Sequence, residues 1–135
     1  MVWVAPLLLV ALILVAGGLW AVRLSRPSPE AQIGEAVQRM SGQLDVLRVS
    51  HYTSEVVEDG QVKMEPEYQA ALEDLARARQ EWRAIRGQVP EGQAQPVDEG
   101  LEKLDASLRS RRPPEEVDRQ VGELIRSLQG LSPSS

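Results

Sequence analysis

The sequence predicts an all-α protein in which one N-terminal transmembrane helix is followed by an antiparallel four-helix bundle. An unbroken apolar run opens the chain, and apolar residues then recur at steps of three and four as on one face of a helix. Short Pro- and Gly-containing segments separate these stripes, which favours a bundle of antiparallel neighbours. No stretch alternates with period two, so we expect no sheet. The predicted domains are an anchor at 2–24, a linker at 25–28, a helical bundle at 29–131 and a disordered tail at 132–135.

The anchor is predicted from residues 2–22, VWVAPLLLVALILVAGGLWAV, which contain no charged side chain. As a helix this run reaches roughly 30 Å, the thickness of the hydrocarbon core of a bilayer. Trp3 and Trp20 lie near its two ends, where interfacial tryptophans are common. We therefore expect a single-pass protein of the cell membrane that contacts lipid through residues 2–22. A cleaved signal peptide is the alternative, but no basic residue precedes the run and residues 15–17 are a weak cleavage site.

The first helix of the bundle is predicted to begin after the segment SRPSPE. Ser28 is a good N-cap, and Pro29 then occupies the first helical position, where its missing N–H costs nothing. We expect the helix to continue through His51 to Val56 and to stop at Gly60. Its apolar stripe consists of Ile33, Val37, Met40, Leu44 and Leu47.

The second helix is predicted to follow Pro66 and carries a heptad-like seam. The segment 87–96 has no apolar period, so we expect it to be an exposed loop. The third helix runs from Val97 to the RRPP turn at 111–114, and the fourth runs from there to Leu131. The seam of the second helix is made of Tyr68, Ala71, Leu75, Ala78, Trp82, Ile85 and Val89.

Composition excludes several functions. The chain has no cysteine, which rules out disulfides, thiolate zinc sites and iron–sulfur clusters. It contains no phosphate-binding loop, dinucleotide motif or nucleophile elbow, so we expect neither an enzyme nor a bound cofactor. Every acidic residue lies after Pro27, and the resulting acidic body is a poor binder of nucleic acid.

The single histidine is the main candidate for metal chemistry. On a continuous helix, His51 and Glu55 share one face and Glu58 lies about one turn further on. Imidazole with carboxylates binds iron, manganese or zinc, so His51, Glu55 and Glu58 form the candidate metal set. Because the chain supplies only one histidine, we favour the alternative that His51 lies at the edge of the core and bonds to a neighbouring carboxylate.

Five residues are candidates for contact with a partner protein. Tyr68 and Trp82 lie on the seam, where burial is expected, and they would become partner hot spots only if exposed. Arg109, Arg111 and Arg112 cluster at a helix C-terminus, where cations complement the helix dipole. The alternative for this basic cluster is contact with lipid phosphates or with an acidic partner.

The segment VDEGLEKLDASLRSRRPPEEVDRQVGELIRSLQ at 97–129 resembles part of the helical extracytoplasmic domain that accompanies high-affinity iron permeases. In that family a leucine-striped helix ends in a short basic or glycine turn, and a Pro–acidic start opens the next helix. HYTSEVVEDG and YQAALEDLARARQEW look like its central helices. The resemblance implies an extracytoplasmic sensing or metal-handling accessory domain. The permease's membrane-embedded glutamate motif is absent from residues 2–22, so this segment is not expected to conduct iron.

Two hypotheses for the function follow. The first is a single-pass membrane-anchored accessory or scaffold protein that acts through protein–protein contacts, with a partner or as a homo-oligomer. The alternative is a membrane-tethered domain that binds or senses iron. The side of the membrane stays open, since Arg23 and Arg26 place the body in the cytoplasm by the positive-inside rule whereas the resemblance implies the extracytoplasmic side.

Overall fold

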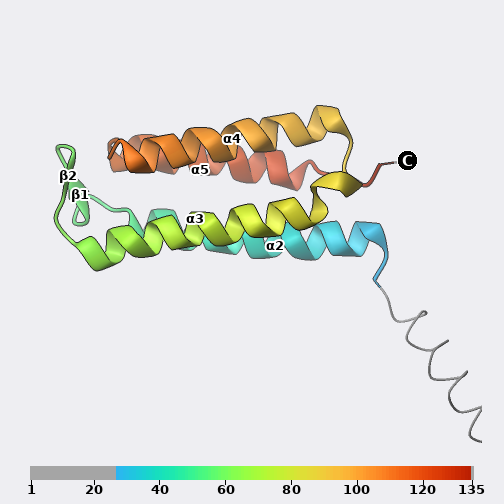
Figure 1. Cartoon of the computed structure of the whole chain (residues 1–135), viewed down its shortest axis with the longest axis horizontal. Helices are drawn as coiled ribbons and strands as arrows, with labels where there is room; N and C mark the ends of the chain where they lie inside the picture. Colours follow the sequence, from blue (N-terminus) through green and yellow to red (C-terminus); the bar gives the residue numbers. More distant parts are fainter. Residues whose placement is uncertain (1–26, 135) are drawn as a thin grey trace, which may run out of the picture.

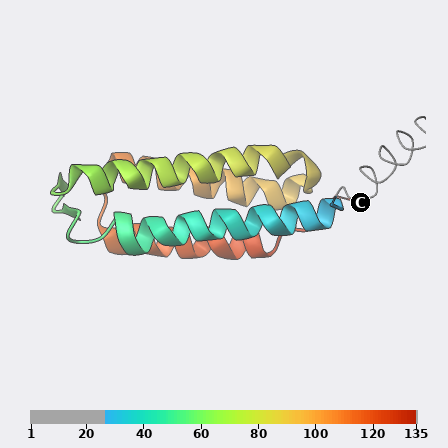
Figure 2. The ribbon, with the colours of Figure 1, turned by 90° about the horizontal axis from the view of Figure 1, so that it is seen from below.

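The computed structural model describes residues 27–134, which form a four-helix bundle (Figure 1). Its helices are α2 (Pro29–Val46), α3 (Glu65–Ile85), α4 (Glu91–Arg109) and α5 (Pro114–Gln129). Each runs antiparallel to the preceding one, and the α2–α3 pair packs against the α4–α5 pair (Figures 1 and 2). The predicted antiparallel four-helix bundle is confirmed. The predicted anchor lies outside the described residues, and within 27–134 no helix has the length and apolar character needed to cross a bilayer.

The start of α2 follows the prediction. The Ser28 side chain accepts a hydrogen bond of 3.1 Å from the N–H of Ala31, and Pro29 is the first helical residue. The buried face of α2 begins at Ile33 and includes Met40 and Leu44. The N-cap and the apolar stripe therefore position this helix.

The end of α2 departs from the prediction of a helix that continues to Val56. The α-helix gives way at Leu47–His51 to a π-helix, and the chain then leaves helical geometry at Tyr52. β1 (Val57–Glu58) and β2 (Gln61–Val62) form an antiparallel hairpin, so the prediction of no sheet is wrong. The hairpin was missed because each strand has only two residues, too few to show a period.

The turn of this hairpin has a recognisable sequence signal. Asp59 and Gly60 have φ angles of 52° and 75°. Positive φ at both central residues is the requirement of a type I′ turn, for which Asp–Gly is a preferred pair. Gly60 is therefore a central residue of a hairpin turn and does not mark the end of a helix.

The structure of the segment 87–96 also differs from the predicted exposed loop. A 3₁₀ turn, η2 (Arg86–Gln88), joins α3 to α4, and Val89 is buried immediately after it. α4 begins at Glu91, six residues before the predicted start, and buries Ala94 in its first turns. Pro96 lies inside α4, where its missing N–H removes one intrahelical hydrogen bond.

The two ends of the bundle are distinct. The start of α2, the η2 turn and the C-terminal residues lie at one end, and the β1–β2 hairpin lies with the α4–α5 turn at the other (Figure 1). At the first end Ser134 N–H donates to the carbonyl of Gln88 at 2.8 Å, and Ser132 N–H donates to Gln93 Oε1 at 2.9 Å. Residues 132–134, which the sequence placed in a disordered tail, are thus hydrogen-bonded to the bundle.

Candidate functional site

His51 lies at the edge of the core and is bonded to a carboxylate, as the favoured sequence hypothesis predicted. It is the last residue of the π-helix, and its Nδ1 lies 2.5 Å from Asp74 Oδ2 on α3. The Asp74 side chain is only 3% exposed, and its other oxygen accepts a hydrogen bond of 2.7 Å from Arg77 Nη2. A buried carboxylate is costly unless it is paired and hydrogen-bonded, and Asp74 has both partners.

The other ring nitrogen of His51 faces a second carboxylate. Nε2 lies 3.9 Å from Glu67 Oε2 in the first turn of α3, and the His51 side chain is 23% exposed. The imidazole thus lies between Asp74, which is buried, and Glu67, which is partly exposed. This arrangement joins the end of α2 to two positions of α3 that are about two turns apart.

The candidate metal set is not assembled in the predicted way. The helical spacing assumed for His51, Glu55 and Glu58 is wrong, because the helix ends at His51. Glu55 is exposed in the turn that follows, and Glu58 forms an ion pair with Lys63 across the hairpin. In the described part of the chain no group of three His, Asp or Glu side chains is arranged to hold a metal ion.

Tyr68 and Trp82 are buried, as their positions on the seam predicted, and this removes them from the partner-contact candidates. The Tyr68 hydroxyl donates to the carbonyl of Leu108 at 2.8 Å, and Trp82 Nε1 donates to Asp98 Oδ1 at 2.7 Å. Both polar atoms are therefore satisfied by α4, and both rings serve to hold α3 against α4.

Asp98 is also the centre of an ion-pair network that sequence reasoning missed. Arg86 donates to both Asp98 oxygens, with Nη2 to Oδ2 at 2.7 Å, and to Glu91 Oε1 at 2.9 Å. The hydrogen bond from Arg86 lowers the pKa of Asp98 below its ordinary value, against the opposing effect of burial, and Trp82 contributes in the same direction. Hydrogen bonds to both carboxylates raise the pKa of Arg86. The network fastens the η2 turn to α4.

The three arginines of the basic cluster differ in their ion pairs. Arg109 Nε pairs with Asp105 at 3.1 Å, and Arg112 Nε pairs with Glu116 at 2.8 Å, each one turn away. Arg111 is exposed and takes part in no ion pair within residues 27–134. Of the three predicted contact residues, Arg111 therefore offers the guanidinium most available to a partner.

The backbone at Arg111 has an unusual conformation. Its φ of 55° lies in the left-handed region, where helix C-caps normally have glycine. Arg111 N–H donates to Leu108 O at 3.1 Å and Arg112 N–H donates to Ser107 O at 3.0 Å, the hydrogen-bond pattern of a Schellman motif. The left-handed conformation costs a residue with a Cβ about 1–2 kcal/mol relative to right-handed backbone.

The turn that contains Arg111 is held by Tyr52. The Tyr52 hydroxyl donates to the Arg112 carbonyl at 2.7 Å, and burial of the ring, followed by the proximity of Tyr68, raises the pKa of Tyr52 to about 12. A cavity of about 290 Å³ lies between this turn and the hairpin. It is lined by Ser54, Val57, Glu58, Asp59, Gly60, Arg111, Pro113, Pro114 and Glu115.

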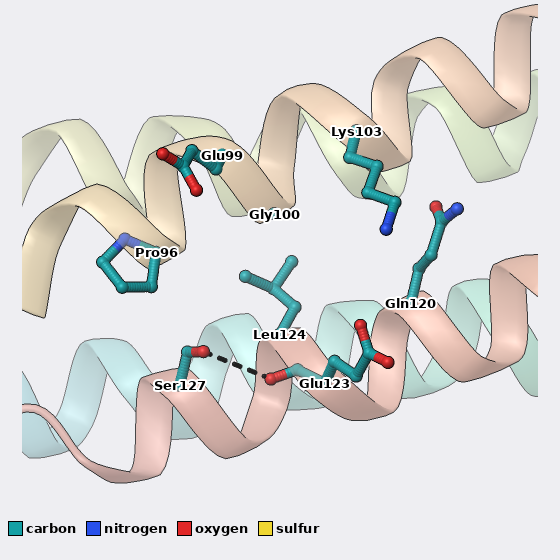
Figure 3. Close-up of a pocket in the computed structure, with 8 residues that line it drawn as sticks. All are labelled: Pro96, Glu99, Gly100, Lys103, Gln120, Glu123, Leu124 and Ser127. Atoms are coloured by element: carbon teal, nitrogen blue, oxygen red, sulfur yellow. Dashed lines mark hydrogen bonds between the residues drawn. The ribbon is translucent and has the colours of Figure 1, made fainter.

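A second cavity, of about 210 Å³, lies between α4 and α5 (Figure 3). Lys103 points from α4 toward α5, and Gln120 points from α5 toward α4. Gln120 is 5% exposed and its Oε1 has no hydrogen-bond partner in the structure. The cavity lies beside Gly100, where a Cβ would meet Leu124 Cδ1 at 2.9 Å, so the missing side chain allows α4 and α5 to approach closely.

Comparison with known proteins gives one match. The model of the iron permease-associated 4-helix bundle domain matches residues 28–135, which include the whole described bundle. No curated protein and no solved structure matches the sequence. The chain belongs to the family of iron permease-associated four-helix bundle domains.

Proposed function

We propose that this protein is a membrane-tethered accessory subunit of an iron permease and that it acts through protein contacts, without catalysis. Membership of the iron permease-associated family is the observation on which this proposal rests. The apolar run at residues 2–22 supports a single-pass anchor, because it has the length and the interfacial tryptophans of a membrane-spanning helix. The linker that follows leads directly into Pro29, the first residue of α2.

The contact surface that we propose is the end of the bundle that contains the hairpin and the α4–α5 turn. α3 has 21 residues and is therefore roughly 30 Å long, so this end lies far from the tethered start of α2. Arg111 lies there, exposed and in a conformation that costs stability, and costly conformations that persist are often found at functional positions. An acidic loop of the partner would complement its charge.

We propose that the body lies on the extracytoplasmic side, as the resemblance to the domain of iron permeases implies and against the two arginines that follow residues 2–22. The chain has no cysteine, so Glu73→Cys, at an exposed position of α3, would supply its only thiol. A membrane-impermeant maleimide should label this variant in intact cells. Labelling only after the membrane is permeabilised would place the body in the cytoplasm.

Iron uptake tests the accessory role. Cells that lack this protein but retain the permease should take up radioactive iron more slowly, and the full chain should restore the rate at unchanged permease abundance. Arg111→Gln should restore it incompletely, because it removes the available guanidinium. Arg119→Gln, at an exposed position on α5, is the matched control and should restore it fully. Uptake that is the same with and without this protein would refute the proposal.

A further inference from the structure

We propose that the groove between α3 and α4 is the docking site for an acidic segment of the permease, whose carboxylates bind the arginines along the groove. The inference rests on the proposed function, since the partner is taken to be the permease, and it adds the face of the bundle and the chemistry of the segment. The groove opens at the proposed contact surface, because α3 begins and α4 ends at the hairpin end of the bundle (Figure 1).

The α3–α4 groove contains two adjoining cavities. The first has a volume of about 370 Å³ and an apolar floor, in which Leu72 and Leu75 lie toward the core and Ala76 is too short to fill the space between the helices. The second has a volume of about 300 Å³ and shares Arg79 and Arg83 with the first. From Leu72 to Arg83 the lining residues follow roughly 17 Å of α3, the length of about five residues of an extended chain.

The first cavity has an excess of positive charge, although the whole chain has a net charge of −5. Within residues 27–134, Asp105 is the one carboxylate that lines it, and two arginines share this group. Arg109 Nε lies 3.1 Å from Asp105 Oδ2, and Arg79 Nη1 lies 3.7 Å from Oδ1. One carboxylate balances one of the two guanidiniums, so a positive charge is left over. The Arg109 side chain is 68% exposed and binds Asp105 through Nε, which leaves its Nη atoms accessible to another carboxylate.

Two further arginines of α3 line the same cavity. Arg77 Nη2 lies 2.7 Å from Asp74 Oδ1, and these two charges cancel. Arg83 is exposed and takes part in no ion pair within the described bundle, so it adds a second positive charge. Arg79 and Arg83 are one helical turn apart, about 5–6 Å, which is close to the ~6.6 Å between alternate side chains of an extended chain. Two carboxylates at alternate positions therefore match the two guanidiniums, which bind carboxylates through paired N–H groups.

The second cavity does not have this excess of positive charge. It is lined by three arginines and three acidic residues: Arg79, Arg83, Arg86, Asp98, Glu99 and Glu102. The first cavity also lies nearer the hairpin end, since its lining includes Leu72 in the first two turns of α3 and Arg109 at the end of α4. The acidic part of the segment is therefore expected in the first cavity, next to the contact surface that contains Arg111.

Photo-cross-linking of the full chain in membranes that contain the permease tests the docking site. p-Benzoyl-L-phenylalanine would replace Gln80, which is exposed and lines the first cavity, and would replace Arg119 on α5 in the control. Irradiation should join the Gln80 variant to a permease peptide that has acidic residues at alternate positions, and the Arg119 variant should not be joined. If the Gln80 variant is joined to lipid, to a second copy of this chain or to nothing, the docking site is wrong.

Charge reversal separates this inference from the proposed function. Arg83→Glu removes no ion pair from the bundle and should reduce the permease recovered with the chain about 5–10-fold, because an attraction is replaced by a repulsion. Arg83→Lys keeps the charge and should reduce it about 2-fold at most. Arg119→Glu is the matched control and should leave the recovery unchanged.

The outcomes of these variants are distinguishable. Recovery that Arg83→Glu leaves unchanged, or that Arg119→Glu reduces as strongly, would overturn the docking site and leave the accessory role intact. Absence of the permease from every sample, including the unsubstituted chain, would overturn both. Circular dichroism confirms that each variant is folded.

Discussion

Replacing Arg111 with glycine is predicted to stabilise the bundle and at the same time to weaken the contact with the permease. The residue has φ of 55° at the C′ position of the Schellman motif that ends α4. Both hydrogen bonds of this motif are made by backbone atoms, so glycine retains them. The substitution therefore changes only the backbone preference and the exposed guanidinium.

The expected gain in the free energy of unfolding is the difference between two opposing effects of the Arg111→Gly substitution. Removing the Cβ relieves a left-handed conformation that costs about 1–2 kcal/mol. Glycine also gives the unfolded chain more conformational freedom, which opposes this gain by about 0.4–1 kcal/mol. Arg111 makes no ion pair in residues 27–134, so the substitution removes no ion pair from the bundle. We expect the free energy of unfolding to rise by about 0.5–1 kcal/mol, which raises Tm by roughly 2–8 °C in a domain of this size.

Urea unfolding of the full chain in mild detergent, followed by far-UV circular dichroism, measures this change. Arg111→Ala is the control, since it removes the same guanidinium but retains a Cβ and therefore the left-handed cost. It should unfold within about 0.5 kcal/mol of the unsubstituted protein. An Arg111→Gly variant that is no more stable than Arg111→Ala would refute the strain argument.

Three further predictions concern the bundle itself. The pKa of Tyr52 is raised to about 12, so its hydroxyl holds the proton more tightly in the folded protein. The stability that it provides is complete below its unfolded pKa near 10 and is lost as pH rises toward 12. The free energy of unfolding of Tyr52→Phe, measured at alkaline pH, should lack this decrease. Asp98 has a lowered pKa, so its contribution is present above the unfolded pKa near 4 and is lost as pH falls, and Asp98→Asn should flatten the acid limb of the stability curve. Gly100→Val should destabilise the bundle by about 1–3 kcal/mol in urea unfolding, because its Cβ would meet Leu124 Cδ1 at 2.9 Å. Gly92→Val, on the same helix with no atom within 4 Å of its Cβ, should cost less than 1 kcal/mol.

The helices could be predicted from the sequence where local signals agreed. Ser28 and Pro29 predicted the start of α2. Steps of three and four predicted most of the buried residues of α2 and α3, although Val37 is only partly buried. Prediction failed where the local pattern was short or ambiguous. The apolar stripe continues in the sequence through His51 although the helix ends there, and Gly60, the predicted helix stop, belongs with Asp59 to a hairpin turn.

The surroundings of His51 could not be predicted, because they depend on contacts between helices that only the folded bundle creates. The sequence suggested that His51 bonds to a neighbouring carboxylate, but it selected Glu55 and Glu58 as its metal partners because they lie nearby in the chain. The carboxylates that it faces are Asp74 and Glu67, which come from the next helix. Their identity depends on the axial register of α2 against α3, and that register is set by packing along the whole interface.

The sequence also could not reveal which arginine of the basic cluster has a guanidinium available to a partner protein. Arg109 and Arg112 have acidic residues one turn away, a spacing that predicts their ion pairs. The left-handed conformation of Arg111 could not be read from the sequence, since glycine is the usual signal for that position.

Purification of the full chain from membranes that contain the permease shows whether this protein works by binding an iron permease at the membrane. We expect the two proteins to elute together in mild detergent, Arg111→Gln to reduce the recovered permease and Arg119→Gln to leave it unchanged. Elution of this protein free of the permease, as a monomer or as a homo-oligomer, would contradict this expectation.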